Sequence, residues 1–572
     1  MKVSKNIIQE INYWKRRLTN VNVGDKNVSK LCQEWREILA ASIVQPVLSA
    51  SAKRILFVTG SLGTNPNALS VESFLIKSLQ MRGHECVSLV CNAGLPSCEF
   101  NIYGPGDGPD EQFPYALTRP AKRQSCDACL GATHRVMDTI GCPTQDLSAY
   151  ATEGEVENIW KIVSSLPSDN IHEFVHQGIK VGDHAFSSTV RITLRGTVDY
   201  SNPYELWVYR KQLLSAMLMV DRFNRMLDQV RPEKMVAIHG VYLFHGTAVD
   251  VCTQRGIDVV VYGAPYRKNT LFFSHDETYH RSLITEEAKH WESLDLNQEM
   301  EQCLDSYLDS KTAGGRDSVN YHPNPITERE SVLKAMNINP TIPVVALFTN
   351  VIWDAQIYYN KNAFKDIFDW LYTTIEYFGK RTDIQLVLRV HPAESKGGFT
   401  TKQPIEPEIN ARFPVLPSNV HVIPSQSDIS SYTLVDMSKA ALIYGTKMGL
   451  EIAIRGVPVI VSGETFCRGK GFTCDVETRQ QYIDYLDNIL DFSENDKAKI
   501  ERARKFAYYY FFMRMIDMPL LNLQLANTLK EGSFFNFSKL EALLPESDRN
   551  LDVICDGIVH HAPFYLDKFK TI

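Results

Sequence analysis

The sequence predicts an α/β protein with two Rossmann-like domains facing a cleft, and with helical extensions at both ends. The chain has 572 residues, which is too long for one ordinary hydrophobic core and suggests two or three domains. Two separate series of short apolar runs alternate with helix-like segments, as is typical of parallel sheets covered by helices. Open α/β sheets bind ligands at the carboxyl ends of their strands, so we expect the binding site there.

The domain boundaries follow from periodicity and composition. Apolar residues at helical spacing over 6–41 predict a helical segment before the first apolar run. The stretch 282–324 is charged and lacks strand-like runs, so the connection between the domains is placed there. The expected segments are a helical extension 1–50, a first domain 51–285, a linker 286–335, a second domain 336–494 and a helical tail 495–572.

Charge and hydropathy limit the classes of partner and compartment. The chain carries 60 basic and 67 acidic residues, for a formal net charge of -7, so we expect no nucleic acid partner. No apolar run approaches the roughly 20 residues needed to cross a bilayer. The N-terminus is polar and charged, unlike a secretion signal. We therefore expect a cytoplasmic protein.

Twelve cysteines are scattered along the chain, which indicates reduced thiols rather than a disulfide scaffold. The local group formed by Cys126, Cys129 and Cys142, with His134 nearby, leaves a structural zinc site open. The second CxxC pair of common zinc modules is missing, so buried or loop thiols are the favoured interpretation and no metal site is expected.

The first series begins with an apolar run over 55–58 that ends in the turn Gly60-Ser61-Leu62-Gly63. A helix-like segment over 69–81 and a second apolar run over 86–90 follow it. The turn lacks the third glycine of the dinucleotide motif GxGxxG, which disfavours a nicotinamide-dependent oxidoreductase.

The most informative residues lie in the second series. Arg389 closes an apolar strand, and His391 and Pro392 follow at the predicted ligand-binding edge. Both basic side chains can donate hydrogen bonds to a phosphate group. An ordinary histidine in a turn is the alternative reading.

A strand-to-helix junction at 444–451 has the character of an anion site. Thr446, Lys447, Met448 and Gly449 offer a hydroxyl, an ammonium and the backbone N–H groups of a helix start. Glu451 falls in the first helical turn, where a carboxylate can accept both hydroxyls of a ribose or can simply interact with the helix dipole. The motif GxxxxGK[ST] is absent, which disfavours a P-loop ATPase.

Two further turns complete the candidate set. Ser427, Ser430 and Ser431 crowd the start of another helix, where one of them or the intervening Asp428 is expected to cap the helix while the others can hold phosphate or base. Lys470 lies between two glycines after the last strand and can reach a phosphate, although a solvated loop lysine is an equal alternative.

Taken in order, five segments of the second half of the chain resemble capsule polysaccharide biosynthesis proteins. The first half resembles this family more loosely, mainly over Ile55–Gly60 and His239–Arg267. The segments that carry the resemblance are Leu347–Asp354, Arg389–Pro392, Ser427–Ser431, Tyr444–Glu451 and Gly456–Ile460.

The resemblance implies a glycosyltransferase of the GT-B type. It acts on a nucleotide sugar held by the second domain and on a glycan or glycolipid held by the first. His391 and Pro392 look like the His-Pro motif that sialyl- and Kdo-type transferases set against the donor phosphate, and Glu451 is similar to a ribose-binding carboxylate. The chain departs from the best-defined Kdo transferases in its length and in the insert Ser125–Cys142, which leaves the donor open.

The expected donor follows from the same resemblance. The donor is a substrate linked to CMP or UDP, and no separate cofactor is expected. Separately from the resemblance, the helical N-terminal stretch or the aromatic tail is expected to dock to a membrane-bound polysaccharide assembly complex, with peripheral attachment at the inner face of the plasma membrane.

Glycosyl transfer with inversion needs a general base and groups that stabilise the departing phosphate. His391, Lys447 and the helix start at Thr446 can stabilise the phosphate without a metal. His239, which closes a strand of the first domain, is the first choice for the base, with Asp276 or Glu277 as alternatives. A histidine with a purely structural role in the turn is also compatible with the sequence.

The two asparagines that follow the first strand, Asn65 and Asn67, can position the acceptor. Two other functions remain open. One is a sugar-nucleotide 2-epimerase with the same architecture, and the other is a non-catalytic nucleotide- or glycan-binding scaffold. No compact set of carboxylates in the first domain favours the epimerase.

Overall fold

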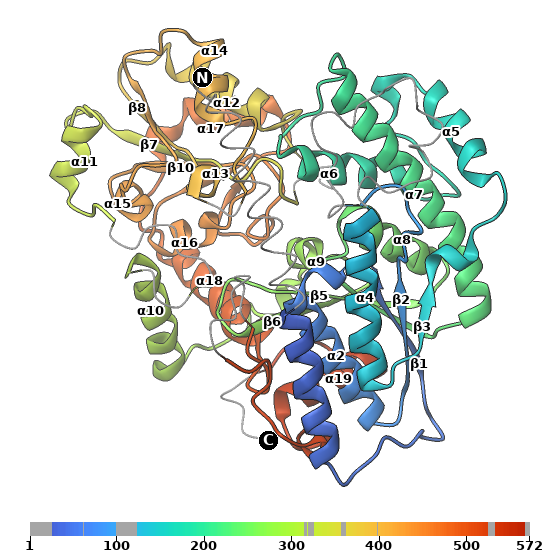
Figure 1. The fold of residues 1–572 in the computed structure, drawn as a ribbon. Helices are drawn as coiled ribbons and strands as arrows, with labels where there is room; N and C mark the ends of the chain where they lie inside the picture. Colours follow the sequence, from blue (N-terminus) through green and yellow to red (C-terminus); the bar gives the residue numbers. More distant parts are fainter. Residues whose placement is uncertain are drawn as a thin grey trace, which may run out of the picture. The chain divides into compact units, whose positions relative to one another are not determined.

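The computed structural model describes residues 26–60, 62–98, 123–313, 317, 325–355, 362–396, 399–523 and 532–566. These residues form two compact units (Figure 1). Unit 1 contains the described parts of Met1–Ile192, Asp199–Tyr279 and Met515–Leu566, and unit 2 contains those of Thr193–Val198 and His280–Arg514.

These units divide the chain differently from the five predicted segments. The stretch expected as a linker belongs to unit 2, because its helix α10 (Gln298–Ala313) buries Leu304 and Tyr307. The expected tail is split at Arg514, and its later part belongs to unit 1. The part of the N-terminal extension over 1–25 lies outside the described residues, whereas 26–41 is helical and buries Trp35 completely.

Unit 1 is built on a seven-stranded sheet with the order β13-β6-β5-β4-β1-β2-β3. Strands β1 to β5 run parallel, and β6 and β13 add antiparallel pairs at one edge. The chain moves from β1 to β3 in one direction and then returns to the other side of β1 with β4, which makes the β1/β4 junction the switch point of the sheet. The strands are β1 (Arg54–Gly60), β2 (Glu85–Val90), β3 (Thr144–Asp146), β4 (Lys234–Ile238), β5 (Asp258–Gly263), β6 (Thr270–His275) and β13 (Ile516–Asp517).

Helices cover this sheet and connect its strands. The longest is α7, which begins at an asparagine cap whose side chain accepts from two backbone N–H groups. Besides the helix over 26–41, the helices of unit 1 include α2 (Pro66–Met81), α4 (Arg123–Ile140), α5 (Glu155–Ser165), α6 (Val181–Thr193), α7 (Pro203–Val230), α8 (Thr247–Gln254) and α19 (Arg549–His560). Shorter turns are η1 (Leu62–Thr64), η2 (Leu147–Tyr150), η3 (Ser168–Asn170), the π-helix η4 (Tyr242–Gly246) and η8 (Leu540–Leu543).

Unit 2 is built on a six-stranded sheet in which every pair is parallel, with the order β12-β11-β10-β7-β8-β9. Strands β7, β8 and β10 are buried along their whole lengths, as expected of parallel strands covered on both faces. Its switch point is the β7/β10 junction. The strands are β7 (Val344–Phe348), β8 (Gln385–Arg389), β9 (Val420–Ile423), β10 (Ala440–Ile443), β11 (Val459–Val461) and β12 (Cys474–Asp475).

The helices of unit 2 include α18, which packs along α16 (Figure 1). They are α9 (Tyr279–Thr285), α10, α11 (Arg329–Ala335), α12 (Ile367–Phe378), α13 (Ala393–Lys396), α14 (Ile405–Arg412), α15 (Ser431–Asp436), α16 (Met448–Ile454), α17 (Arg479–Asp487) and α18 (Lys497–Tyr508). Shorter turns are η5 (Ala288–His290), η6 (Ile489–Asp491) and the π-helix η7 (Tyr509–Arg514). The predicted mixed α/β class with two parallel sheets is confirmed. No helix in the described part of the chain has the length and apolarity that crossing a bilayer requires.

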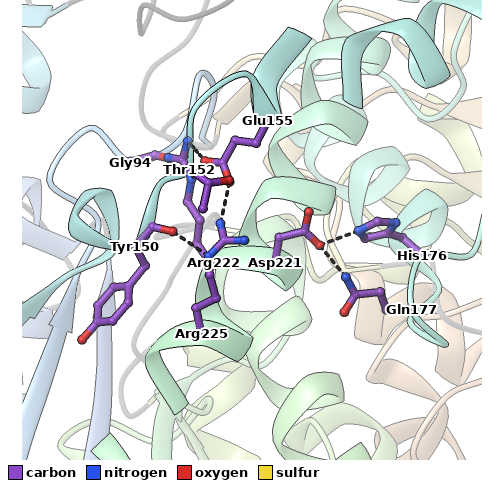
Figure 2. A network of polar contacts seen from close by, with 9 residues as sticks. All are labelled: Gly94, Tyr150, Thr152, Glu155, His176, Gln177, Asp221, Arg222 and Arg225. Atoms are coloured by element: carbon purple, nitrogen blue, oxygen red, sulfur yellow. Dashed lines mark hydrogen bonds and ion pairs between the residues drawn. The ribbon is translucent and has the colours of Figure 1, made fainter. Parts of the chain in front are cut away.

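A buried ion network joins α5 to α7 in unit 1 (Figure 2). Glu155, at the start of α5, accepts a hydrogen bond of 2.6 Å from Arg222 Nε and pairs with Arg225 through its other oxygen. Arg222 also donates to the carbonyl of Gly94, and Arg225 Nε donates to the carbonyl of Tyr150 at 2.7 Å. Glu155 and Arg222 are both buried, so each supplies the charge that makes burial of the other tolerable.

A second pair of contacts extends this network along α7. Asp221 accepts hydrogen bonds from His176 Nε2 at 2.6 Å and from Gln177 Nε2 at 2.7 Å (Figure 2). Gln177 has a positive φ of 50°, and the two bonds hold this strained turn against the helix.

Glu72 is an isolated carboxyl group in the core of unit 1. It lies on α2 and is completely buried, and its Oε1 accepts a hydrogen bond of 3.2 Å from Tyr262 of β5. Burial raises the pKa of Glu72 to about 7, although hydrogen bonds from Thr59 and Tyr262 oppose the rise. The side chain therefore takes up a proton more readily in the folded protein than in the unfolded chain.

We expect Glu155→Gln to lower the free energy of unfolding by about 3 kcal/mol, because it leaves the buried guanidinium of Arg222 without a counter-charge. Glu157→Gln, an exposed change on the same helix, is the control and should have almost no effect. Urea denaturation of both variants measures the difference, and equal stabilities would show that the buried pair has no stabilising role.

Glu72→Gln should alter the pH dependence of stability. The folded-state pKa lies above the ordinary value of 4.5, so the protonated carboxyl stabilises the fold below about pH 4.5 and this contribution is lost as the pH rises through 7. The variant should exceed the wild type by about 1 kcal/mol at pH 5 and by about 3 kcal/mol at pH 8. Denaturation curves at the two pH values check this, and a constant difference between the proteins would contradict it.

Candidate functional site

The carboxyl edge of the unit 2 sheet is organised by the register of its strands. Backbone pairing sets one row across five strands, and parallel pairing keeps the residues of a row level with one another. The row contains Val461, Ile443, Phe348, Arg389 and Ile423. The alignment persists past the strand ends, since Gly463 N still donates to the carbonyl of Tyr444 at 3.2 Å.

The residues two positions beyond this row form the candidate site. They come from the loops after five neighbouring strands, with Asn350 and Gly445 at the switch point and His391 next to them. We call this set the edge row, and it consists of Gly463, Gly445, Asn350, His391 and Ser425. It combines two glycines, where backbone can approach a ligand closely, with three polar side chains.

His391 is held in one tautomer by its own turn. Its backbone N–H donates to Thr349 Oγ1 at 2.9 Å, and its ring Nδ1 accepts a hydrogen bond of 3.1 Å from the backbone N–H of Ala393. A ring nitrogen that accepts cannot carry the proton, so the neutral imidazole has its N–H at Nε2. Pro392 fixes the backbone between His391 and Ala393, and α13 begins directly after Pro392.

Arg389, predicted to contact phosphate, is almost fully buried. Its two terminal nitrogens donate to the carbonyls of Pro424 at 2.7 Å and of Ser427 at 2.9 Å. Burial lowers the pKa of Arg389 to about 10, which still leaves it charged at neutral pH. The guanidinium therefore clamps the loop after β9 to the end of β8, and its contact with a nucleotide stays a prediction.

The serine-rich turn forms the cap of α15. Ser430 is the N-cap residue, and its hydroxyl accepts from the backbone N–H of Thr433 at 3.3 Å. Ser427 Oγ accepts from the backbone N–H of Ile429 at 3.3 Å, and Ser431 is the first helical residue. A serine thus caps this helix as predicted, whereas Asp428 pairs with Lys396 at 2.7 Å. Nucleotide binding by these serines stays a prediction.

The start of α16 is closely packed. Thr446 Oγ1 accepts from the backbone N–H of Met448 at 3.4 Å, and Thr446 is buried. A Cβ atom on Gly449 would lie 2.7 Å from the sulfur of Cys467, so only glycine fits there without displacement. The helix start reaches the switch point because its backbone packs this closely on the loop after β11.

Glu451 and Lys447, predicted to bind ribose and phosphate, belong to a buried ion cluster. Lys311 Nζ lies 3.1 Å from Glu451 Oε1 and 2.8 Å from Asp317 Oδ2. Lys447 Nζ lies 3.3 Å from the same Asp317 oxygen, and Tyr432 donates to Glu451 Oε2 at 2.7 Å. Two lysines and two carboxylates make the cluster electrically neutral.

The opposite charges of this cluster shift one another's pKa values. Burial acts to raise the pKa of Glu451, but attraction to Lys311 and Lys447 holds it below its ordinary value. Burial acts to lower the pKa of Lys311, and the carboxylates of Glu451 and Asp317 reverse this effect. Burial and the charge of Lys311 together lower the pKa of Lys447. All of these groups are therefore drawn into ion pairs, and ligand binding by Glu451 and Lys447 stays a prediction.

Lys470 is also held within unit 2. Its ammonium donates to the carbonyls of Ile284 at 3.0 Å and Glu286 at 2.6 Å, and burial lowers its pKa to about 8. The flanking Gly469 and Gly471 have positive φ angles of 73° and 80°, which turn the chain so that the lysine points inward. Lys470 is therefore a buried lysine and not the solvated loop lysine of the alternative reading, and phosphate binding stays a prediction.

Asn350 was not selected from the sequence as a site residue. Its side chain is 7 % exposed, its Nδ2 donates to the carbonyl of Val351 at 3.2 Å, and its Oδ1 accepts no bond from any described residue. Buried polar atoms are usually satisfied, so such an atom at a switch point makes Asn350 a candidate for contact with a ligand. A polar residue two positions past an apolar strand was the signal for it in the sequence.

The carboxyl edge of the unit 1 sheet carries the predicted base. His239 follows β4 and has a positive φ of 59°, and Gly240 and Tyr242 also have positive φ angles. The π-helix η4 follows at once. Left-handed backbone at non-glycine residues and π-helical turns are both costly and are found often at functional sites. Next to this turn, burial and the charge of His239 lower the pKa of His245 to about 3, so His245 stays neutral.

The loop after β1 lies at the same edge, on the other side of the switch point. Asn65 caps α2 by accepting from the backbone N–H of Ala68 at 3.2 Å, and Asn67 is the second residue of that helix. Gly60 is required because a Cβ atom there would lie 2.4 Å from the ring of Phe244 in η4. The glycine turn therefore serves packing, and acceptor binding by the two asparagines stays a prediction.

The alternative bases lie at the opposite edge of the unit 1 sheet. Strand β6 is antiparallel to β5, so the residues after β6 lie beside the start of β5. Asp276 donates its backbone N–H to Val259 and accepts from the N–H of Val259 at 3.3 Å. Asp276 and Glu277 therefore lie at the other end of β5 from His239, and the choice of the base among these residues stays a prediction.

The cysteines show no sign of a metal site in the described part of the chain. No group of three or more histidine, cysteine, aspartate or glutamate side chains there could hold a metal ion, and no described cysteine forms a disulfide. Cys126 and Cys129 lie on α4, and Cys142 is buried after it. Burial raises the pKa of the Cys142 thiol to about 12, which makes it an unreactive core residue.

No protein-family model and no curated protein matches this chain. Among solved structures it is similar to Thermosulfurimonas dismutans KpsC, a beta Kdo 2,4 transferase, with 12 % identity over 49 % of this chain and 80 % of that chain, and a TM-score of 0.31. It is also similar to the spinosyn rhamnosyltransferase SpnG, with 12 % identity over 79 % of this chain and 95 % of that chain, and a TM-score of 0.26.

A third similar structure is UDP-GlcNAc 2-epimerase from Neisseria meningitidis bound to UDP-GlcNAc. Its identity is 11 % over 80 % of this chain and 98 % of that chain, with a TM-score of 0.24. Transferases and an epimerase thus both occur among the similar structures, at scores too low to decide between them. The fold is established by the strand order of the two sheets, and the function has to be argued from the edge row.

Proposed function

We propose that the protein is a glycosyltransferase that moves a sugar from a nucleotide-activated donor to a glycan or glycolipid acceptor. The observation that supports this most directly is the edge row of unit 2. His391, Asn350 and Gly445 of this row follow three neighbouring parallel strands at the switch point, where open parallel sheets bind nucleotides.

The chemistry of these groups suits a departing nucleotide phosphate. When the bond between sugar and phosphate breaks, negative charge develops on the phosphate oxygens. A neutral imidazole N–H from His391 and the backbone N–H groups at the start of α16 can stabilise this charge. His391 keeps its donor at Nε2 because Ala393 occupies Nδ1. We include metal independence in the proposal because these groups can stabilise the departing phosphate.

The remaining details extend the proposal. His239 in the strained turn of unit 1 is the proposed general base, and inversion of configuration is the proposed outcome. The donor is CMP- or UDP-linked, and the product belongs to surface, capsular-type polysaccharide. Attachment to a membrane-bound assembly complex on the cytoplasmic side is the corresponding partner proposal.

We expect CMP or UDP to raise the melting temperature of the protein, because a ligand that binds only the folded state stabilises it by mass action. His391→Ala should weaken nucleotide binding about tenfold and slow glycosyl transfer about 100-fold, since it removes a donor to the developing charge. Thermal shift titrations and an assay of nucleotide release measure the two effects.

His421→Ala is the matched control, because His421 lies within β9 of the same sheet, level with Val387 and below the edge row. It should leave nucleotide binding unchanged. A wild-type protein that responds to no nucleotide at millimolar concentration would rule out the proposed function and favour the scaffold.

His239→Asn should abolish most transfer, by about 100-fold or more, while nucleotide binding stays as in the wild type. Asparagine tolerates the left-handed backbone of this position but cannot act as a base near neutral pH. Analysis of the products by NMR separates the candidates. A lengthened glycan with released nucleotide supports transfer, whereas an epimerised nucleotide sugar without acceptor would assign the chain as an epimerase.

A further inference from the structure

The amide of Asn350 is oriented by its own loop. Its Nδ2 donates to the carbonyl of Val351 at 3.2 Å, and the reversed amide would place two carbonyl oxygens against each other. The atom left without a partner among the described residues is therefore the oxygen, Oδ1. A ligand group that satisfies it must carry a proton.

This requirement distinguishes between the parts of a nucleotide sugar. Phosphate oxygens at neutral pH are acceptors, so they cannot bond to an amide oxygen. Hydroxyls of a ribose or of the transferred sugar can donate to it. The edge row then has complementary neighbours, with an N–H donor on His391 for phosphate and an acceptor on Asn350 for a hydroxyl.

The carboxylate expected to receive these hydroxyls is already engaged. Glu451 Oε1 lies 3.1 Å from Lys311 Nζ, and Oε2 accepts from Tyr432 at 2.7 Å. Both contacts come from residues that are themselves in the buried ion cluster. Each oxygen of Glu451 therefore already has a partner, whereas the oxygen of Asn350 accepts no bond from the described residues, so Asn350 is the buried acceptor that still needs a donor.

We propose that Asn350, rather than Glu451, accepts a hydrogen bond from a sugar hydroxyl of the bound nucleotide sugar. This inference rests on the proposed function. It assigns the edge row a division of roles, in which His391 binds phosphate and Asn350 recognises a hydroxyl. The hydroxyl belongs either to the ribose or to the transferred sugar, and the two can be told apart by experiment.

The test compares wild type and Asn350→Leu in their affinities for CMP and UDP, for the 2′-deoxy forms of both, and for nucleotide sugars built on them. Asn350→Leu should weaken binding about tenfold, the usual effect of losing one good hydrogen bond. If the ribose donates, the variant loses affinity for the free nucleotides and no longer prefers them over the 2′-deoxy forms. If the transferred sugar donates, only the affinity for nucleotide sugars falls.

Stability provides an independent readout. Asn350→Leu removes a buried acceptor without a partner among the described residues together with one hydrogen bond, to the carbonyl of Val351, so the melting temperature without nucleotide should change little. Asn419→Leu is the matched control at the amino end of β9. Its Nδ2 donates to three carbonyls at 2.9, 2.9 and 3.0 Å, so this change should lower the melting temperature and leave nucleotide affinity unchanged.

The outcomes separate this inference from the proposed function. If the wild type binds a nucleotide and Asn350→Leu binds every ligand with the same affinity as the wild type, the proposed hydroxyl contact is wrong while the proposed function stands. If Asn350→Leu behaves like Asn419→Leu, Asn350 has a structural role and the inference is overturned. If wild type binds no nucleotide, the proposed function fails and this inference with it.

Discussion

Six parallel strands in unit 2 share one register, and every feature of the candidate site depends on that constraint. Strands of different lengths, from different parts of the chain, end level with one another because the backbone pairs Phe348 with both Ile443 and Arg389. A shift by one residue in any strand would turn its side chains to the other face and break the edge row. The position of the candidate site is therefore set by the strand register of the sheet, and the individual residues determine only its chemistry.

Arg389 shows how the fold maintains this edge. A charged side chain is costly to bury, and here two backbone carbonyls of the loop after β9 accept from its terminal nitrogens. The loop in turn positions Ser425 and the cap of α15. Arg389 is the last residue of β8, two positions before His391, and its side chain is buried against the loop beside the site, which it stabilises.

The sequence predicted the parts of this protein that depend on local pattern. The alternation of apolar runs and helices identified both sheets, and the apolar strand before His391 placed that residue at a carboxyl edge. The parts that depend on contacts between distant segments were not predictable. Lys311 reaches Glu451 across 140 positions of sequence, the residues after Met515 return to unit 1, and β6 runs antiparallel and carries Asp276 to the far edge. Asn350 was missed because the sequence does not show that its buried Oδ1 lacks a hydrogen-bond partner among the described residues.

The ion cluster around Glu451 is the reason why we assign the contact with a sugar hydroxyl to Asn350 and not to Glu451. Glu451 could give up Lys311 to bind a hydroxyl only if Lys311 kept enough compensation from Asp317, because a buried ammonium with one partner removed is strongly destabilised. Asn350 carries no charge, and its oxygen accepts no bond from the described residues. A hydroxyl that donates to this amide satisfies a buried acceptor without changing the charge balance, whereas both oxygens of Glu451 are already satisfied by Lys311 and Tyr432.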